Sequence, residues 1–252
     1  CGLTLRWSRL APAWHLARVA VVLIIGLAGQ APSRRSRLSS NVRRQMEEST
    51  RILRRYTSLA AALHALETKS LTLLPPDKWD DEIDRGLMAA YRRRQNLQSV
   101  LALCFSAAGE TYHHWRVFAQ SDSGACLTFE RKRLEKSAKH AGVVTKRITY
   151  KKIADDRAQP VTTAELPFTK RFAFRDEREV RMLFTSADKE LKFKSVPFEP
   201  GALEELILSP WTPDALVDSV RNSVQRIPGL PVVEVRKSTL FNSKYWRAIA
   251  DA

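Results

Sequence analysis

Several residue types and motifs that mark well-known protein classes are scarce or absent in this 252-residue sequence. Its three cysteines cannot form a disulfide framework, and nine glycines with twelve prolines exclude fibrous and low-complexity proteins. Hydrophobic and charged contents of 44% and 27% exclude a disordered chain and a polytopic membrane protein. The scarcity of cysteine favours a reducing compartment, and we expect a cytoplasmic protein.

The motifs of common nucleotide, metal and hydrolase sites are also missing. The chain has no G-x-x-x-x-G-K-[ST] phosphate loop, no G-x-G-x-x-G, no H-E-x-x-H and no G-x-S-x-G. No cysteines and histidines have zinc-site spacing, and the adjacent His113 and His114 would diverge by about 100° on a helix. We therefore expect no metal site, and we interpret both histidines as surface or substrate-facing groups.

Acidic residues are absent from the first 45 positions, which hold eight arginines and no Asp, Glu or Lys. These positions carry +8 of the net charge of +15. The remaining 207 residues carry 34 basic and 27 acidic side chains, or +7. That smaller excess allows an anionic ligand such as NAD or RNA but does not require one.

The N-terminal segment, residues 1–45, has three interpretations. Its apolar run Val19–Gly29 covers eleven residues, whereas a helix needs ~20 to cross a bilayer, so a transmembrane helix is disfavoured. Sequence translated upstream of the true start is favoured, because the chain begins at Cys1 and its charge balance becomes normal at Met46. A secretory signal cleaved near Gly29-Gln30-Ala31, which would leave secretion open, and a genuine basic tail are the alternatives.

Hydrophobic periodicity predicts the elements of the remaining domain, residues 46–252. Helical spacing indicates helices at 58–70, 83–94, 112–118, 130–139 and 214–225. Apolar runs and alternation indicate strands at 100–105, 125–129, 144–150, 177–184, 191–195, 203–208 and 231–235. Strands cluster after residue 100 and helices dominate before it. We therefore predict a single α+β domain, with N-terminal helices followed by a mixed, mainly antiparallel sheet of about six to eight strands.

The most specific chemical feature is the charged run Glu177-Arg178-Glu179 with Arg181. Alternation along a strand would place Glu177, Glu179 and Arg181 on one face. One interpretation is a solvent-facing strand with side-by-side ion pairs, and the other is a functional cleft, since ionised groups are rarely buried without partners. A second feature is Ser106, which follows the apolar run Val100–Phe105 and is well placed either for chemistry or simply to end a strand.

Short motifs between Leu53 and Ser238 follow one another in a defined order. They are Arg54-Arg55-Tyr56, Pro76-Asp77-Lys78-Trp79-Asp80-Asp81, Leu103-Cys104-Phe105-Ser106, Trp115 with Phe118-Ala119, Gly124, and Lys170 with Glu177-Arg178-Glu179-Val180-Arg181. In order and spacing the set resembles the bacterial domain-of-unknown-function family numbered twenty-nine seventy-one. The chain departs from that family at Trp79, Glu82 and Phe118, where the family has Phe, Pro and Tyr. The family label brings no established reaction.

An early arginine, a serine that closes a central strand and a later Glu-x-Glu also resemble the pattern of arginine-serine-glutamate ADP-ribosyltransferases. The resemblance implies that NAD is the substrate, with Arg55 on its diphosphate and Ser106 bracing the nicotinamide ribose. Glu179 would hold the ribose 2′-hydroxyl and stabilise the oxocarbenium ion, while Glu177 would steer or deprotonate the acceptor. An aromatic side chain would stack on a flat ring of the ligand. The remaining cofactor-binding candidates are Tyr56, Trp115 and Arg181.

The resemblance implies an NAD-dependent ADP-ribosyltransferase or NAD glycohydrolase, of the toxin or phage-defence type, with a protein or nucleic-acid acceptor. The alternative is a basic module that binds nucleic acid or a nucleotide without turnover. Its candidate residues are Arg92, Arg93, Arg94, Lys132, Arg133, Lys136 and Lys139. The sequence has no positive sign of a purely structural or partner-binding protein.

Overall fold

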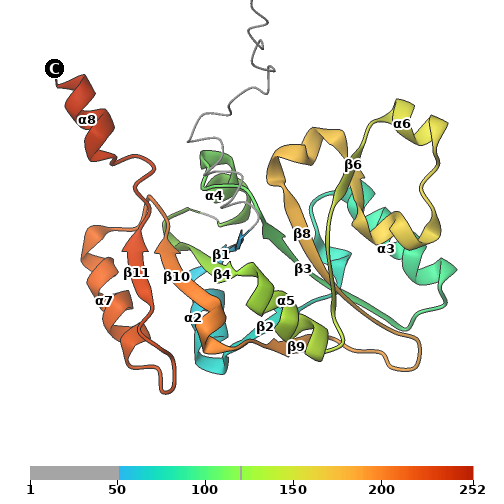
Figure 1. The fold of residues 1–252 in the computed structure, drawn as a ribbon, viewed down its shortest axis with the longest axis horizontal. Coiled ribbons are helices and arrows are strands. Elements are labelled where there is room, and N and C mark those ends of the chain that lie inside the picture. Colours follow the sequence, from blue (N-terminus) through green and yellow to red (C-terminus); the bar gives the residue numbers. More distant parts are fainter. Residues whose placement is uncertain (1–50, 120, 252) are drawn as a thin grey trace, which may run out of the picture. The chain divides into compact units, whose positions relative to one another are not determined.

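A seven-stranded sheet is the centre of the computed structural model, which describes residues 51–119 and 121–251 (Figure 1). In spatial order its strands are β11 (Glu234–Lys237), β10 (Leu203–Leu208), β4 (Gly124–Glu130), β1 (Ile52–Ser58), β3 (Ser99–Ser106), β8 (Glu179–Ser186) and β5 (Val144–Arg147). Neighbouring strands are antiparallel except β10 and β11, which run parallel. The predicted α+β class and the mixed, mainly antiparallel sheet are therefore confirmed.

Two small sheets and the helices complete the described part of the chain. The small sheets pair β2 (Ser70–Leu73) with β9 (Lys194–Pro197) and β6 (Thr149–Lys151) with β7 (Thr169–Arg171). The α-helices are α2 (Leu59–Thr68), α3 (Glu82–Arg94), α4 (Tyr112–Phe118), α5 (Arg131–His140), α6 (Ile153–Ala158), α7 (Asp214–Gln225) and α8 (Lys244–Ala250). Short 3₁₀ turns are η1 (Pro76–Lys78), η2 (Ser121–Ser123), η3 (Thr163–Phe168), η4 (Phe172–Glu177) and η5 (Pro200–Ala202). The five predicted helices correspond to α2, α3, α4, α5 and α7.

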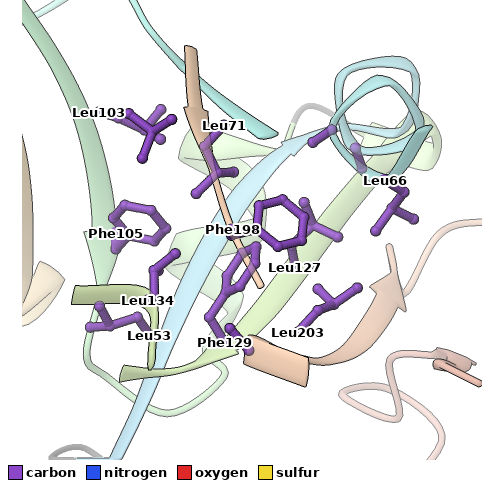
Figure 2. Close-up of a cluster of buried hydrophobic side chains, with 14 of the residues drawn as sticks. Leu53, Leu66, Leu71, Leu103, Phe105, Leu127, Phe129, Leu134, Phe198 and Leu203 are labelled. Atoms are coloured by element: carbon purple, nitrogen blue, oxygen red, sulfur yellow. The ribbon is translucent and has the colours of Figure 1, made fainter. Parts of the chain in front are cut away.

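The main hydrophobic core covers one face of the sheet (Figure 2). Its side chains come from the sheet itself, from α2, α5 and α7, and from β2 and β9. The labelled members in Figure 2 are Leu53, Leu66, Leu71, Leu103, Phe105, Leu127, Phe129, Leu134, Phe198 and Leu203. These three helices and the β2–β9 sheet therefore belong to one side of the sheet, and burying this apolar surface is the main driving force for folding.

Two smaller apolar clusters lie on the opposite face. We call them the α3 cluster, which includes Met88 of α3, and the α4 cluster, which includes Trp115 of α4. The α3 cluster also contains Val100, Ala102, Ile148, Phe168 and Leu183, and the α4 cluster also contains Tyr56, Ala119, Cys126 and Ile207. This face is thus not covered by one continuous core, which leaves room for polar side chains between the two clusters.

The predicted order, with helices ahead of the sheet, is wrong in one respect. The first described element is β1, which lies between β4 and β3 in the interior of the sheet. Its sequence, ILRRYTS, has two arginines in the middle, and these disguise the alternation by which Leu53 enters the main core and Tyr56 the opposite face. A charged pair at the centre of a buried strand is unusual because charged side chains are rarely buried without partners.

Four predicted strand boundaries also differ from the structure. The strands expected at 191–195 and 231–235 begin only at Lys194 and Glu234. The strand expected at 144–150 divides into β5 and β6 at Ile148. The strand expected at 177–184 begins only at Glu179, because Glu177 ends η4 and Arg178 has the left-handed backbone conformation (φ 44°). The predicted N-terminal segment, residues 1–45, lies outside the described residues. Among the described residues, no helix has the length and apolar character needed to cross a membrane.

Candidate active site

A band of polar side chains crosses the sheet between the α3 cluster and the α4 cluster. In register across three neighbouring strands, Arg54 of β1 pairs with Ser106 of β3, and Ser106 pairs with Glu179 of β8. Two positions further along these strands, Cys104 of β3 pairs with Arg181 of β8. We call Arg54, Cys104, Ser106, Glu179 and Arg181 the polar band. Arg54, Ser106 and Glu179 are only 5–6% exposed, so the band is a buried polar surface and not a solvent-facing ladder.

Glu179 is held by two cations. Its Oε1 accepts from Arg181 Nε at 2.8 Å, and its Oε2 accepts from Lys170 Nζ at 3.3 Å. Lys170 Nζ also donates to Glu177 Oε2 at 2.7 Å, so one lysine bridges both glutamates. Arg181 in turn forms a bidentate pair with Asp84 of α3. Three carboxyl groups and two cations therefore form one buried network.

The network separates the pKa values of the two glutamates. Burial raises the pKa of Glu179, but the charges of Arg181 and Lys170 outweigh burial and bring that pKa below its usual value. For Glu177, burial dominates over the bond from Lys170, and the pKa is raised. Two neighbouring carboxyl groups with opposite pKa shifts suit different roles, one as a permanent anion and the other as a proton acceptor.

Ser106 has all of its hydrogen-bonding capacity used within the protein. Its Oγ donates to the Glu177 carbonyl oxygen at 2.7 Å and accepts from Ala108 N at 3.0 Å, and His114 Nε2 lies 3.0 Å away. Because Ser106 Oγ already donates its one proton to the Glu177 carbonyl oxygen, we assign the neutral imidazole with its proton on Nε2, which donates to Ser106, while Nδ1 accepts from Thr111 Oγ1 at 2.5 Å. Burial lowers the pKa of His114, in agreement with a neutral ring.

Two predictions concern Ser106 and His114. The Ser106 hydroxyl has one donor and two acceptor sites, and all three are used within the protein, where they hold the backbone at Glu177. Its role beside the nicotinamide ribose stays a prediction. His114 is buried and its ring stacks on Tyr56, with centroids 5.3 Å apart, so it is neither a surface group nor a substrate-facing one. His113 is exposed as predicted.

The two arginines of β1 have different surroundings. Arg55, predicted to bind the diphosphate, donates from Nη1 to the carbonyl oxygen of Cys104 at 3.0 Å. Burial lowers its pKa, and the charge of Glu179 opposes that shift. Arg54, which was not predicted, is the register partner of Ser106 and donates to the Ala108 carbonyl oxygen at 2.9 Å. The arginine aligned with Ser106 and Glu179 is therefore Arg54.

The structure buries three further residues that were predicted to contact the ligand. Arg181 is 0% exposed and forms ion pairs with Asp84 and Glu179. Trp115 is also 0% exposed, packs edge-on against Tyr56 and donates from Nε1 to Glu110 at 2.9 Å. Tyr56 is 4% exposed and lies between the rings of Trp115 and His114. Both aromatic rings are packed within the α4 cluster, and their contact with a ligand ring stays a prediction.

Asp84 and Lys170 are the functional candidates that sequence reasoning missed as site residues. Asp84 follows the helix start at Asp81, whose Oδ1 accepts from the backbone N–H groups of Ile83 and Asp84. An acidic residue in the first turn of a helix is normally explained by its interaction with the helix dipole. The sequence therefore gives no sign that Asp84 pairs with an arginine 97 positions away. Lys170 lies in the three-residue strand β7, which is too short to give an alternation signal.

The basic residues of the alternative hypothesis do not form one surface. Those of α3 and α5 lie on helices that pack on opposite faces of the sheet. Arg92 donates to the carbonyl oxygens of Leu97 and Gln98 and so closes the end of α3. Arg92 and Arg93 also line a cavity of about 810 Å³ beside the start of β3, and no polar-band residue lines that cavity.

Comparisons with known proteins show only a remote structural similarity. No protein-family model matches the chain, and no curated protein matches it. Among solved structures, DarT of Thermus sp. 2.9 in complex with NAD+ is similar with a TM-score of 0.39 at 12% identity, over 74% of this chain and 94% of that chain. The complex of the same protein with ADP-ribosylated ssDNA gives a TM-score of 0.37 at 12% identity, over 76% and 93%. Similarity at this level does not assign the chain to a family, and the resemblance to the family numbered twenty-nine seventy-one stays a prediction.

Proposed function

We propose that the chain is an NAD-dependent ADP-ribosyltransferase or NAD glycohydrolase whose active site is the polar band. The observation that carries the proposal is the register of Arg54, Ser106 and Glu179 on three adjacent strands, with Glu179 held ionised by two buried cations. Buried ionised groups with shifted pKa values are concentrated at functional sites. A stable core has no need of three carboxylates and two cations, because apolar side chains fill such space at lower cost.

Glu179 supplies the charge that the reaction needs. When the bond between nicotinamide and ribose C1′ breaks, nicotinamide leaves as a neutral molecule with the bonding electrons, and positive charge develops on the ribose as an oxocarbenium ion. A carboxylate held ionised in a site shielded from water stabilises that charge more than it stabilises the ground state. We assign Glu179 this role, together with a hydrogen bond to the ribose 2′-hydroxyl.

Arg54 and Arg55 serve the diphosphate in this proposal. A guanidinium is planar and donates in parallel pairs to phosphate oxygens, which suits an NAD diphosphate. Arg54 lies on the polar band, and Arg55 is the next residue of the same strand, with its charge close enough to be influenced by Glu179. We assign Arg54 the main contact and Arg55 a supporting one.

Glu177 is assigned the proton transfer to the acceptor side. Its carboxyl lies beside Glu179 on the shared Lys170, and burial raises its pKa, which makes it a stronger base than an ordinary carboxylate. An acceptor oxygen or nitrogen forms a bond to ribose C1′, and its proton moves to Glu177. With water as acceptor the products are ADP-ribose and nicotinamide, and with a macromolecule the product is the ADP-ribosylated acceptor.

The test is to incubate the purified full chain with NAD and to measure nicotinamide and ADP-ribose by chromatography. We expect nicotinamide release by the wild-type protein and a loss on the order of 100-fold in Glu179→Gln, which keeps the shape but removes the charge. The matched control is Glu234→Gln, an exposed glutamate of β11, which should retain full activity. No release by the wild-type protein, or equal release by Glu179→Gln, would contradict the proposal.

A further inference from the structure

Asp84 lies on α3, outside the polar band, yet it is joined to Glu179 through one intermediate residue. Its Oδ1 accepts from Arg181 Nη1 at 3.0 Å and its Oδ2 accepts from Arg181 Nη2 at 2.7 Å. The carboxyl group is almost fully buried. A bidentate pair between a carboxylate and a guanidinium fixes the plane of the guanidinium as well as its distance.

All N–H groups of the Arg181 guanidinium have acceptors in its present orientation. Of its five N–H groups, one on Nε points to Glu179 Oε1, and two on Nη1 and Nη2 point to Asp84. The second Nη1 donor goes to the Pro167 carbonyl oxygen at 2.8 Å, and Nη2 lies 2.8 Å from Glu179 Oε1. The ring of Trp79 covers the guanidinium, with its centroid 4.6 Å from Cζ. Rotation of this group would break several bonds at once.

Trp79, Asp81 and Asp84 belong to one rigid start of α3. Asp81 caps the helix and accepts from the backbone N–H of Asp84, while Arg85 Nη1 donates to the Trp79 carbonyl oxygen at 2.9 Å. The side chain that grips Arg181 and the ring that covers it are therefore fixed to each other. This segment lies about a hundred residues before β8 in the sequence, and the folded chain brings it into contact with β8 through Arg181.

We infer that Asp84 is a positioning residue for Glu179: it orients the Arg181 guanidinium, and the guanidinium fixes the direction of the Glu179 carboxylate. Arg181 occupies Oε1, so the Oε2 edge, shared only with Lys170 among the bonds described above, is the one turned to a ligand. The kinetic consequence of this inference rests on the proposed function, whereas the orientation of Arg181 does not. α3 thus acts as a support for the site and not only as a cover for one apolar cluster.

Asp84 also has an electrostatic effect that a purely structural residue would lack. Glu177 is faced by Lys170 of β7, Glu179 of β8, Asp84 of α3 and Tyr150 of β6, and its carbonyl lies near His114 of α4. Burial is the main cause of the raised pKa of Glu177, and the negative charge of Asp84 adds to it. Replacing Asp84 by asparagine removes that charge, so the pKa of Glu177 should fall.

The first experiment observes Arg181 directly, without activity. In the wild-type chain we expect ¹⁵N NMR to show separate, slowly exchanging Nη–H signals for Arg181, assigned with Arg181→Lys. In Asp84→Asn these signals should broaden or merge, whereas Asp80→Asn, an exposed neighbour, should leave them unchanged. Trp79→Leu, which removes no charge, should also broaden them and serves if Asp84→Asn does not fold. Unchanged Arg181 signals in whichever of these two variants folds would overturn the inference.

The second experiment measures nicotinamide release. For Asp84→Asn we expect kcat to fall on the order of 100-fold, as for a misplaced reacting group, with KM for NAD changed less than about threefold. The acid limb of its pH profile should move to lower pH, and Asp84→Glu should recover part of the rate. A loss confined to KM, or a profile that does not move, would overturn the inference. If the Arg181 signals respond as expected but the wild-type chain releases no nicotinamide, the positioning role stands and the proposed function fails.

Discussion

Replacing Arg181 by methionine should expose how much of the stability depends on the buried charge network. Methionine is apolar, similar in length and lacks the charge, so the substitution leaves Lys170 as the one cation among the described contacts of three buried carboxylates. Asp84 would keep only Lys170, at 3.9 Å. Removing one partner of a buried ion pair costs about 3–5 kcal/mol, because the other charge stays buried without compensation. For a domain of this size we expect the melting temperature to fall by about 10 °C.

The pH dependence follows from the direction of each pKa shift. In the wild-type protein the pKa of Glu179 is lowered by folding. Glu179 therefore adds to the free energy of unfolding above the carboxyl pKa of the unfolded chain, and this stabilisation is lost as pH falls. In Arg181→Met the carboxylates that lost their cation have raised pKa values and take up protons on folding, which stabilises the variant in acid. The difference in the free energy of unfolding between the wild-type protein and Arg181→Met should therefore be largest near pH 7 and become smaller toward about pH 5.

Urea and thermal unfolding followed by circular dichroism at pH 7.5 and pH 5 measure both effects. The control is the double variant Asp84→Leu/Arg181→Met, which replaces both partners of the bidentate pair by apolar side chains and should regain at least half of the lost stability. If the free energy of unfolding of Arg181→Met lies within about 0.5 kcal/mol of the wild-type value at pH 7.5, Arg181 does not stabilise the buried carboxylates. A double variant no more stable than the single one would contradict the same reasoning.

The remaining predictions concern the elements that support the site. Ser106→Ala should lower the free energy of unfolding by about 1–3 kcal/mol in urea titrations, because Ala108 N and His114 Nε2 lose a buried partner. Ser195→Ala on β9 is the exposed control. Equal stability of the two variants would refute the role of Ser106. Gly124→Ala should destabilise by about 3 kcal/mol or more, because a Cβ there would meet the Ala119 carbonyl oxygen at 2.1 Å. In Gly86→Ala in α3 the new Cβ would meet nothing within 4 Å, and the free energy of unfolding should rise by about 0.5–1 kcal/mol. Equal stability of Gly124→Ala and Gly86→Ala would disprove the close approach of Gly124 to Ala119.

Much of the fold was predictable where periodicity is undisturbed. Leu63 and Leu66 of α2, the apolar run of β3 and the start of α7 at Asp214 gave the correct elements, since helical and strand periods are properties of the local sequence. β1 was not recognised, because its paired arginines contradict the rule that a central strand is apolar. Their burial depends on partners from β3 and the loop after it, which no local pattern contains.

The candidate site was predictable in part for the same reason. Glu177, Glu179 and Arg181 stood out as a charged run, and the structure shows all three buried together, although Glu177 lies in η4 and not in a strand. Asp84 and Lys170 complete the network through contacts that only the folded chain makes. Which arginine of β1 aligns with Ser106 depends on the register between β1 and β3, and no local pattern contains that register.

In the proposed function, Glu179 provides charge to the transition state of NAD cleavage. The most direct measurement is the rate of nicotinamide release in a single turnover at saturating NAD, for the wild-type chain and for Glu179→Gln, alongside the NAD affinity of each. We expect a similar NAD affinity and a rate on the order of 100-fold lower in the variant, since the interaction is made mainly in the transition state. Equal rates at saturation would contradict it.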